Sequence, residues 1–436
     1  MERYERYKDS GVKWIGEIPG HWELRKMKYT FCERSQKGFP NEPLLAATQN
    51  HGVIKKSDYE NRTVEATKNL DTLKLVEKGD FVISLRSFQG GIEYSYCRGI
   101  ISPAYTVLKA HHLSEPYFKH LAKSPSFIDL LKSSVTGIRE GQNIDYNKLK
   151  VEFMPIPTIE EQQAIATYLD TITAKIDEAI AQQQKMIDLL NERKQIIINN
   201  AVTKGLNPDA PMKDSGVDWI GKIPEHWEVS RIKNVITLLT DYDANGSFSD
   251  IAKNCNINNG TPYAWMVRTT DLVNNRVGIV EGNNYCDKKT YDYLAKSSLE
   301  SGDLLMTKRG NVGMVYVVPE CSCPMTLAPN LYLLKTKASD INNRYLMHYL
   351  SSTKPKSQLA ILNKSTTLGA LYKDDVKSLQ IVLPPIDEQL LLAQFIDKEL
   401  DKVDSVISNC NRQISLLQER KQIIINDVVT GKVKVS

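Results

Sequence analysis

Few side chains in this sequence have the types and spacing that catalysis requires. Two pairs of neighbouring carboxylates, Glu160–Glu161 and Asp387–Glu388, are the nearest thing to a general acid and base. Each pair falls in the first turn of a predicted helix, where acidic side chains interact favourably with the helix dipole, so we interpret both as structural. The seven histidines do not cluster, and His21 and His226 stand beside tryptophans in a repeated block, which favours a structural role for them too.

Recognisable enzyme motifs and metal-binding patterns are missing from the sequence. It contains no NPPY or DPPF tetrapeptide of an amino-methyltransferase, no GxxxxGK[ST] phosphate loop, no HExxH and no GxSxG. The seven cysteines are scattered, and Cys321 and Cys323 are one residue apart rather than the two of a zinc knuckle. We therefore expect reduced thiols, no bound metal or cofactor, and no catalytic activity in this chain.

Polar side chains suited to nucleic-acid contacts follow several predicted strands. Arg, Lys, Asn, Gln and Ser read base edges, and Arg and Lys also bind phosphates. The main candidates for DNA contact are Arg86, Ser87, Gln89, Arg139, Gln142 and Asn143 in the first half of the chain, and Lys308, Arg309, Asn311, Lys364, Ser365, Thr366 and Tyr372 in the second. Weaker candidates are Lys55 and Lys56, and Arg268 with Thr269 and Thr270.

Each of these candidates has a simpler interpretation, which is a solvated surface side chain. Arg86 follows GDFVISL and Arg309 follows GDLLMTK, so the two arginines occupy equivalent positions. That equivalence favours a shared role, which is either DNA contact or a structural salt bridge.

The composition is that of an ordinary globular protein. The chain has 436 residues, of which 41% are hydrophobic and 25% charged, and this length predicts two to four domains. The net charge of +4 permits nucleic-acid binding without requiring it. Because no apolar run reaches the 18 residues of a membrane span and the N-terminus has no apolar signal core, we expect a soluble, cytoplasmic protein.

The sequence contains an internal repeat. Residues 8–24 (KDSGVKWIGEIPGHWEL) recur at 213–229 as KDSGVDWIGKIPEHWEV, an offset of 205 residues. ERKQIIIN at 192–199 recurs unchanged at 419–426, an offset of 227. Between these anchors, residues 26–155 and 231–382 share only skeletal features. The pattern indicates two similar frames that hold two divergent inserts.

Two long helices are predicted to end the two halves. Residues 158–200 follow Pro157, and Thr158 with Glu161 fits a capping box. Apolar residues then recur at heptad spacing, and we expect the two helices to pack on each other. The predicted seam positions are Ile165, Ile172, Ala179 and Met186 with Leu169, Ile176, Leu190 and Ile197 in the first helix, and Leu392, Ile396, Val403, Val406, Cys410, Leu417 and Ile424 in the second.

The inserts are rich in short β-type runs broken by turns, with shorter helical stretches near 116–132 and 343–362. We expect an α+β fold in which each insert is a domain with a curved sheet. The predicted boundaries are 1–156 for the first domain, 157–205 for a central helix, 206–383 for the second domain and 384–436 for a C-terminal helix.

A duplicated frame with divergent inserts has a geometric use if DNA is the ligand. DNA-binding dimers bind palindromes because protein symmetry matches site symmetry. A fused dimer whose recognition domains have diverged would bind two different half-sites. A helix of about 60 Å at 1.5 Å per residue would span about 18 base pairs between them.

The sequence resembles the specificity subunit of type I restriction–modification systems over essentially its whole length. The resemblance is carried by the KDSGxxWIGxIPxHWE blocks from Lys8 and Lys213, the EEQ and DEQ openings after Pro157 and Pro384, and the repeated ERKQIII segments. It implies two target-recognition domains and an antiparallel pair of spacer helices related by a pseudo-twofold repeat. It also implies a bipartite, asymmetric double-stranded DNA target with an unspecified gap.

The resemblance further implies partners that carry the chemistry. Two methyltransferase subunits would modify adenine with S-adenosylmethionine, and two motor–nuclease restriction subunits would use ATP and Mg. The repeated frame, including the helix ends around Arg193 and Arg420, is then expected to dock the methyltransferase subunits.

Two other functions remain open on sequence grounds. One is an adaptor that uses paired recognition domains on non-DNA partners. The other is the recognition half of a single-chain restriction–methylation enzyme, which the missing catalytic motifs disfavour.

Overall fold

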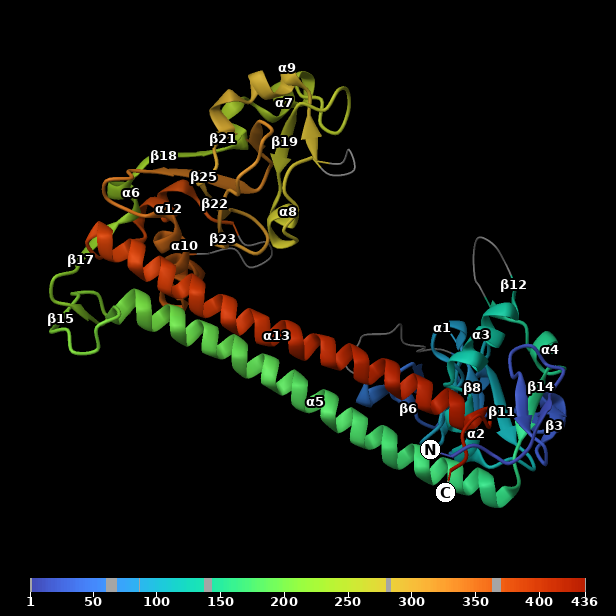
Figure 1. Ribbon diagram of the computed structural model, residues 1–436. Coiled ribbons are helices and arrows are strands. Elements are labelled where there is room, and N and C mark those ends of the chain that lie inside the picture. The colour runs from blue at the N-terminus through green and yellow to red at the C-terminus, as the bar shows by residue number, and fades with distance from the viewer. Residues whose placement is uncertain are drawn as a thin grey trace. The chain divides into compact units, whose positions relative to one another are not determined.

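Two compact units make up the computed structural model, which describes residues 2–59, 69–85, 87–136, 143–279, 284–362 and 370–435. Unit 1 comprises Met1–Lys185 with Cys410–Ser436, and unit 2 comprises Met186–Asn409. Each unit holds one β-rich domain and part of two long helices, α5 (Ile159–Lys204) and α13 (Ile386–Val429) (Figure 1). The predicted α+β class, with two β-rich domains joined by two long antiparallel helices, is confirmed.

Helix α5 begins at the predicted cap. The Thr158 amide donates to the Glu161 carboxylate at 3.1 Å, and the Glu161 amide donates to the Thr158 hydroxyl at 3.3 Å. This reciprocal pair is the capping box that the sequence predicts. At the other end, Gly205 has a φ of +75° and its amide donates to the Ala201 carbonyl, which closes the last turn.

Equivalent ion pairs join the two long helices in each unit. In unit 1, Lys421 Nζ contacts the Asp177 carboxylate at 2.7 Å. In unit 2, Lys194 Nζ contacts the Asp404 carboxylate at 2.7 Å. Asp177 and Asp404, like Lys194 and Lys421, are separated by the 227-residue offset of the repeat. The duplication therefore places the same contact in both units.

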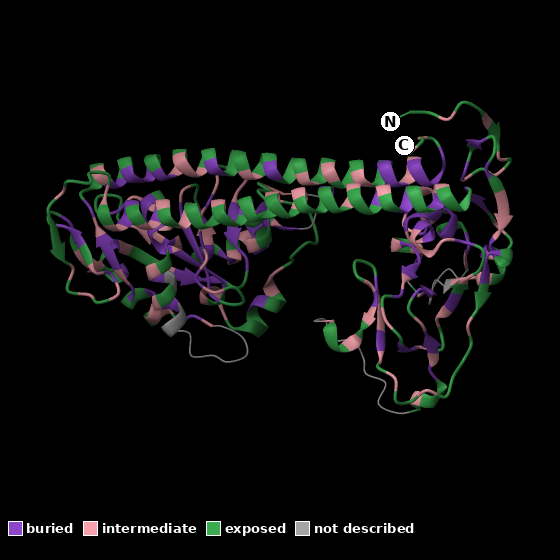
Figure 2. Ribbon diagram, turned by 90° about the horizontal axis from the view of Figure 1, so that it is seen from below, coloured by how far each residue is buried: buried purple, intermediate pink, exposed green. Residues whose placement is uncertain are grey.

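The buried seam of the helices differs from the predicted heptads in its middle. Ile165 is buried as predicted, but Met186 is 48% exposed, and Ile187 is 7% exposed in its place. In α13, Val406 is 45% exposed and Ile407 is the more buried neighbour. Both long helices carry exposed residues along their length with buried and intermediate residues between them (Figure 2). A straight α-helix drifts by about 20° per heptad from a strict seven-residue row, so the buried position moves on by one residue. The predictions for Met186 and Val406 were wrong for this reason.

The β-rich domains share one sheet order. Unit 1 has β4-β11-β8-β9 and unit 2 has β18-β25-β22-β23, all antiparallel. The strands in unit 1 are β4 (Phe31–Glu33), β11 (Thr106–Ala110), β8 (Phe81–Ile83) and β9 (Glu93–Tyr94), and those in unit 2 are β18 (Ile236–Asp241), β25 (Leu331–Thr336), β22 (Leu304–Thr307) and β23 (Val315–Val317).

A second set of strands is also shared. In unit 2 the order is β20-β19-β24-β21, with β19 parallel to β24. In unit 1, β5 pairs with β6 and β7 with β10, and a parallel bridge from Leu44 to Ile100 joins the two pairs. The bounds are β20 (Tyr285–Cys286), β19 (Ala264–Val267), β24 (Met325–Leu327), β21 (Ser298–Leu299), β5 (Leu45–Thr48), β6 (Gly52–Lys55), β7 (Lys74–Val76) and β10 (Gly99–Ile101).

Short paired strands hold the repeated blocks and the chain that leads into each long helix. The pairs are β1 (Tyr7–Asp9) with β2 (Glu17–Pro19), β3 (Glu23–Lys26) with β14 (Phe153–Ile156), β12 (Val135–Thr136) with β13 (Asn143–Ile144), β15 (Met212–Asp214) with β16 (Lys222–Pro224), and β17 (Glu228–Arg231) with β26 (Gln380–Leu383).

Helical segments appear where the inserts predict them and at several turns. The predicted stretches correspond to α2 (Glu115–Leu121), α3 (Pro125–Ser133), α10 (Asn343–Ser351) and α11 (Thr353–Leu362). The remaining helices are α1 (Ser87–Gly90), α4 (Tyr146–Leu149), α6 (Ile232–Val235), α7 (Phe248–Asn254), α8 (Thr269–Val273), α9 (Lys288–Tyr293) and α12 (Lys373–Ser378).

Replacing Leu392 with alanine is expected to destabilise unit 2. Leu392 is fully buried in the core that contains Trp227 and Ile396, whereas its neighbour Leu391 is exposed. We expect Leu392→Ala to cost about 2–5 kcal/mol, because it leaves a cavity in a packed core. Leu391→Ala should change stability by less than about 0.5 kcal/mol. Urea denaturation midpoints of the two variants measure this, and equal midpoints would contradict the burial of the seam.

Candidate nucleic-acid interface

In unit 2, the ends of two strands and one turn lie together. The Ala328 amide donates to the Val267 carbonyl at the end of β19, and the Lys308 amide after β22 donates to the Asn330 carbonyl. Residues 268–270, 308–311 and 328–330 therefore form one border of the domain, which we call the unit 2 edge. It contains five of the predicted contact residues: Arg268, Thr269, Lys308, Arg309 and Asn311.

Arg309 and Asn311 are exposed on the unit 2 edge, whereas Lys308 is buried. Arg309 forms no ion pair among the described residues. The Lys308 ammonium instead contacts the carboxylates of Asp241 at 2.9 Å and Asp243 at 2.6 Å. With its charge already paired, we interpret Lys308 as a structural residue and leave it out of the interface.

Arg268 and Tyr372 also lie at the unit 2 edge, and different contacts position them there. Arg268 caps α8 and pairs with the buried Asp271 at 3.3 Å, which fixes its guanidinium while leaving part of it exposed. Tyr372 is 68% exposed, and it follows Leu371, whose amide donates to the Lys308 carbonyl. Thr269 is half-buried at the start of α8.

Unit 1 has a corresponding edge around a polar cavity of about 390 Å³. Its lining includes Thr48 at the end of β5, Gln49–His51 after it, Ser84 and Leu85 after β8, and Tyr105 from the turn that precedes β11. The strand orders make β5 the counterpart of β19 and β8 the counterpart of β22. Residues 49–51, 84–85, 87–89 and 102–105 therefore form the unit 1 edge.

Only part of the predicted set in unit 1 can be placed. Gln89 is exposed on the unit 1 edge. Ser87 is 1% exposed and its hydroxyl accepts the Ser84 amide, so we interpret it as the residue that closes the turn. Asn143 lies in β13, away from this edge in sequence, and its side chain is not described. Arg86, Arg139 and Gln142 lie outside the described residues, as do Lys364, Ser365 and Thr366 of unit 2.

Sequence reasoning missed the turn Gln49–Asn50–His51. It occupies the place in unit 1 that Arg268–Thr270 occupy in unit 2, directly after the parallel strand. The inserts do not align in this region, so no sequence signal connected the two segments. Only the shared strand order identifies them as equivalent.

The repeated HWE blocks are tied to the starts of the long helices. His21 Nε2 and the Trp22 indole contact Glu161 Oε1 at 2.8 and 3.3 Å. In unit 2, His226 and Trp227 contact Glu388 Oε2 at 2.8 and 2.9 Å. The acidic residues of the first helical turns are therefore structural, and they also satisfy the indole N–H groups of two fully buried tryptophans.

A second set of duplicated contacts links each domain to its helix. Gln162 accepts the Ser114 amide at 2.8 Å, and Gln389 accepts the Asn342 amide at 2.8 Å. His120 contacts Asp170 at 2.9 Å, and His348 contacts Asp397 at 2.8 Å. The shared Y-x-x-H spacing, in YFKH at 117–120 and YLMH at 345–348, is the sequence signal for the last pair.

Burial favours the neutral form of both of these histidines. It lowers the pKa of His120 to about 4, with a further lowering by Lys119 that Asp170 partly opposes. Burial also lowers the pKa of His348, against the opposing effect of Asp397. These side chains serve as hydrogen-bond partners rather than as cations.

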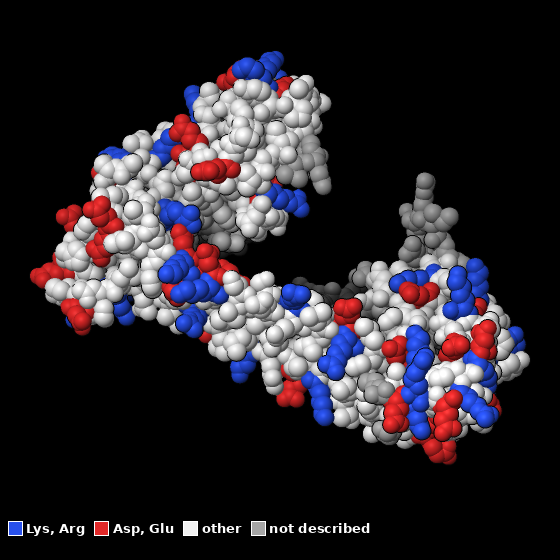
Figure 3. Space-filling model, viewed as in Figure 1, with Lys and Arg blue, Asp and Glu red and all other residues white. Residues whose placement is uncertain are grey.

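Charges do not form a one-signed patch on the face that Figure 3 shows, where Lys and Arg are interspersed with Asp and Glu over both β-rich domains. Among the described residues, no group of three or more His, Cys, Asp or Glu side chains could hold a metal ion. None of the helices in that part of the chain is long and apolar enough to cross a membrane.

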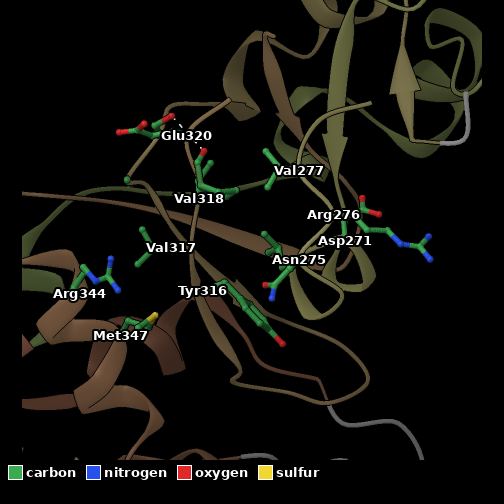
Figure 4. Close-up of a pocket in the computed structure, with 14 residues that line it drawn as sticks. Asp271, Asn275, Arg276, Val277, Tyr316, Val317, Val318, Glu320, Arg344 and Met347 are labelled. Atoms are coloured by element: carbon green, nitrogen blue, oxygen red, sulfur yellow. Dashed lines mark hydrogen bonds between the residues drawn. The ribbon is translucent and has the colours of Figure 1, made fainter. Parts of the chain in front are cut away.

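A cavity of unit 2 lies at the other end of β22 from Arg309. It has a volume of about 820 Å³ and is lined by Ser301 and Gly302 before β22, by Val317 and Val318, and by Arg344 of α10 (Figure 4). Arg344 is held by Asp397 at 2.8 Å. The cavity contains neither a triad nor a pair of close carboxylates, so we assign no reaction to it.

Comparisons with known proteins agree with the architecture. Residues 224–416 match the family described as type I restriction modification DNA specificity domain. The chain is 27% identical over 98% of both chains to a Methanocaldococcus jannaschii protein assigned as the MjaX specificity subunit of a type I restriction enzyme. It is 23% identical over 72% of this chain and 65% of the other to the EcoKI specificity subunit of Escherichia coli.

A solved structure has the same fold. One of its chains, from work on complex assembly and conformational transition of the type I R-M system, superposes with a TM-score of 0.69. It covers 95% of this chain and 99% of that chain at 16% identity. At that identity the likeness establishes the fold alone.

Acid should destabilise unit 1 through His120. The unfolded histidine binds a proton below its usual pKa of 6.5, whereas the native one does so only near 4. Stability is therefore complete above pH 6.5 and is lost as the pH falls toward 4, by at most on the order of 3 kcal/mol. We expect His120→Gln to reduce this pH dependence in urea denaturation, and the exposed His51→Gln to leave it unchanged. An unaltered pH dependence in His120→Gln would contradict the assignment.

Proposed function

We propose that this chain is a specificity subunit of a type I restriction–modification system, and that its two β-rich domains read the two halves of a bipartite, asymmetric DNA target. The observation that supports this most directly is the pair of edges. Equivalent strand ends present Gln49–Asn50–His51 in one domain and Arg268–Thr269–Thr270 in the other. Different side chains on one scaffold suit two different half-sites.

The long helices are proposed to set the gap between the half-sites. Helix α5 has 46 residues and α13 has 44, which correspond to about 65–70 Å at 1.5 Å per residue. That length is comparable to about 20 base pairs. The duplicated Asp177–Lys421 and Lys194–Asp404 pairs support a fixed register between the helices, as a measured gap requires.

The outer faces of the helices are proposed to bind two methyltransferase subunits. Leu189 and Ile196 on α5 and their counterparts Leu416 and Ile423 on α13 are between 51% and 58% exposed. Each pair spans seven residues and therefore lies on one face of its helix. Two copies of one apolar surface fit two copies of one partner. Those partners would bring S-adenosylmethionine, and the motor–nuclease subunits that join them would bring ATP and Mg, all in the cytoplasm.

A map of methylated adenines tests the reading of a bipartite target. Co-expression of this chain with its methyltransferase partner should produce one asymmetric, two-part motif with a fixed gap in single-molecule sequencing. Exchange of residues 231–382 for the insert of a different specificity subunit should change one half of the motif and leave the other half and the gap intact.

Two outcomes would contradict this function. If the bound, soluble complex methylates no motif, and its DNA binding shows no salt dependence, the chain is an adaptor for non-DNA partners. If the insert exchange alters both halves, the domains do not read DNA independently.

Charged substitutions test the docking face. We expect Leu189→Glu with Ile196→Glu to remove one of two bound methyltransferase subunits, because a buried carboxylate is costly in an apolar interface. Adding Leu416→Glu and Ile423→Glu should remove both. Val406→Glu is the matched control, since Val406 is exposed and apolar but has no exposed apolar counterpart on α5. Native mass spectrometry counts the subunits, and an unchanged count in the fourfold variant would refute the assignment.

A further inference from the structure

The turn between β5 and β6 is held rigidly. The Thr48 hydroxyl donates to the Gly52 carbonyl at 3.0 Å, and the His51 amide donates to the Thr48 hydroxyl at 3.1 Å. Gly52 has a φ of +69°, and a Cβ atom there would approach the Tyr94 carbonyl oxygen to 2.6 Å. Only glycine fits this position, so the path of the turn is fixed from both sides.

A lysine ties this turn to the neighbouring one. Lys123 Nζ donates to the Gln49 carbonyl at 3.3 Å and to the Gly90 carbonyl at 2.8 Å. The same ammonium pairs with the buried Glu93 carboxylate at 2.7 Å. The turn after β5 and the short helix that carries Gln89 are therefore held in one arrangement.

The polar side chains of this turn form no hydrogen bonds that hold the described part of the fold together. Gln49, Asn50 and His51 are all exposed. Their side-chain polar atoms form no hydrogen bond among the described residues, although their backbones are bonded. A rigid backbone that presents three unsatisfied polar side chains beside a polar cavity is the arrangement expected of a recognition element.

We propose that this turn is a base-reading element of the first recognition domain, in which the Gln49 and Asn50 amides contact base edges. A two-stranded β-ribbon can enter the major groove. A side-chain amide presents one donor and one acceptor, which together match N7 and the N6 amino group of adenine. The turn therefore specifies an A·T pair in the half-site read by unit 1. This inference rests on the proposed DNA-reading function and names a determinant within it.

The test uses the complete methyltransferase complex and its methylation map. Gln49→Ala and Asn50→Ala should each relax the preference for A·T at one position of one half-site by roughly tenfold to a hundredfold. The gap and the other half-site should remain as in the wild type. Asn41→Ala is the matched control, because Asn41 is an exposed asparagine at the opposite end of β5.

Each outcome decides between the inference and the function beneath it. A wild-type complex that yields no bipartite motif defeats the proposed function. A wild-type motif that persists unchanged in both variants defeats only the role of the turn. If a variant loses methylation altogether, competition among duplexes with single base-pair changes decides, and a preference identical to that of the wild type overturns the inference.

Discussion

The arrangement of each unit depends on one hydrogen bond, in which a glutamate in the first turn of a long helix accepts the N–H of a buried indole. Trp22 and Trp227 are fully buried, and an indole N–H without a partner would cost free energy there. Glu161 and Glu388 provide that partner from the first turn of the long helices, where a carboxylate is also favoured by the helix dipole. Glu161 also completes the capping box. One carboxylate therefore fixes both the start of the helix and the position of the HWE block.

The contacts that hold each domain on its helix are made by other residues than the ones proposed to read DNA. The tryptophan, histidine and glutamine contacts that link each domain to its helix occur in both units. The strand ends that form the unit 1 edge and the unit 2 edge carry different side chains. A recognition edge can therefore change in sequence without altering the contacts that position its domain. Duplication supplies the frame twice, and divergence of the inserts supplies two edges.

The sequence predicted the frame well because repeated segments report shared packing. The caps, the helix starts and the pairing of the helices followed from local chemistry and apolar spacing. The buried residues in the middle of the seam were not predicted correctly. A strict heptad placed Met186 and Val406 in the seam, whereas a straight helix buries Ile187 and leaves Ile407 more buried than Val406. The edges were predicted only in part. Arg309 was found through its equivalence with Arg86, whereas Gln49–His51 has no aligned counterpart and became visible only through the strand order.

Several charged side chains that could contact DNA on sequence grounds are already paired with opposite charges in the fold. Lys308 looked like a DNA contact, but two aspartates neutralise it inside unit 2. Lys123, Lys194 and Lys421 are likewise paired with carboxylates. Pairing of this kind leaves little unbalanced positive charge for attraction to phosphates, as the net charge of +4 also indicates. If the chain reads DNA as proposed, its recognition relies on directional contacts of amides and arginines to base edges, which are the contacts that carry sequence information.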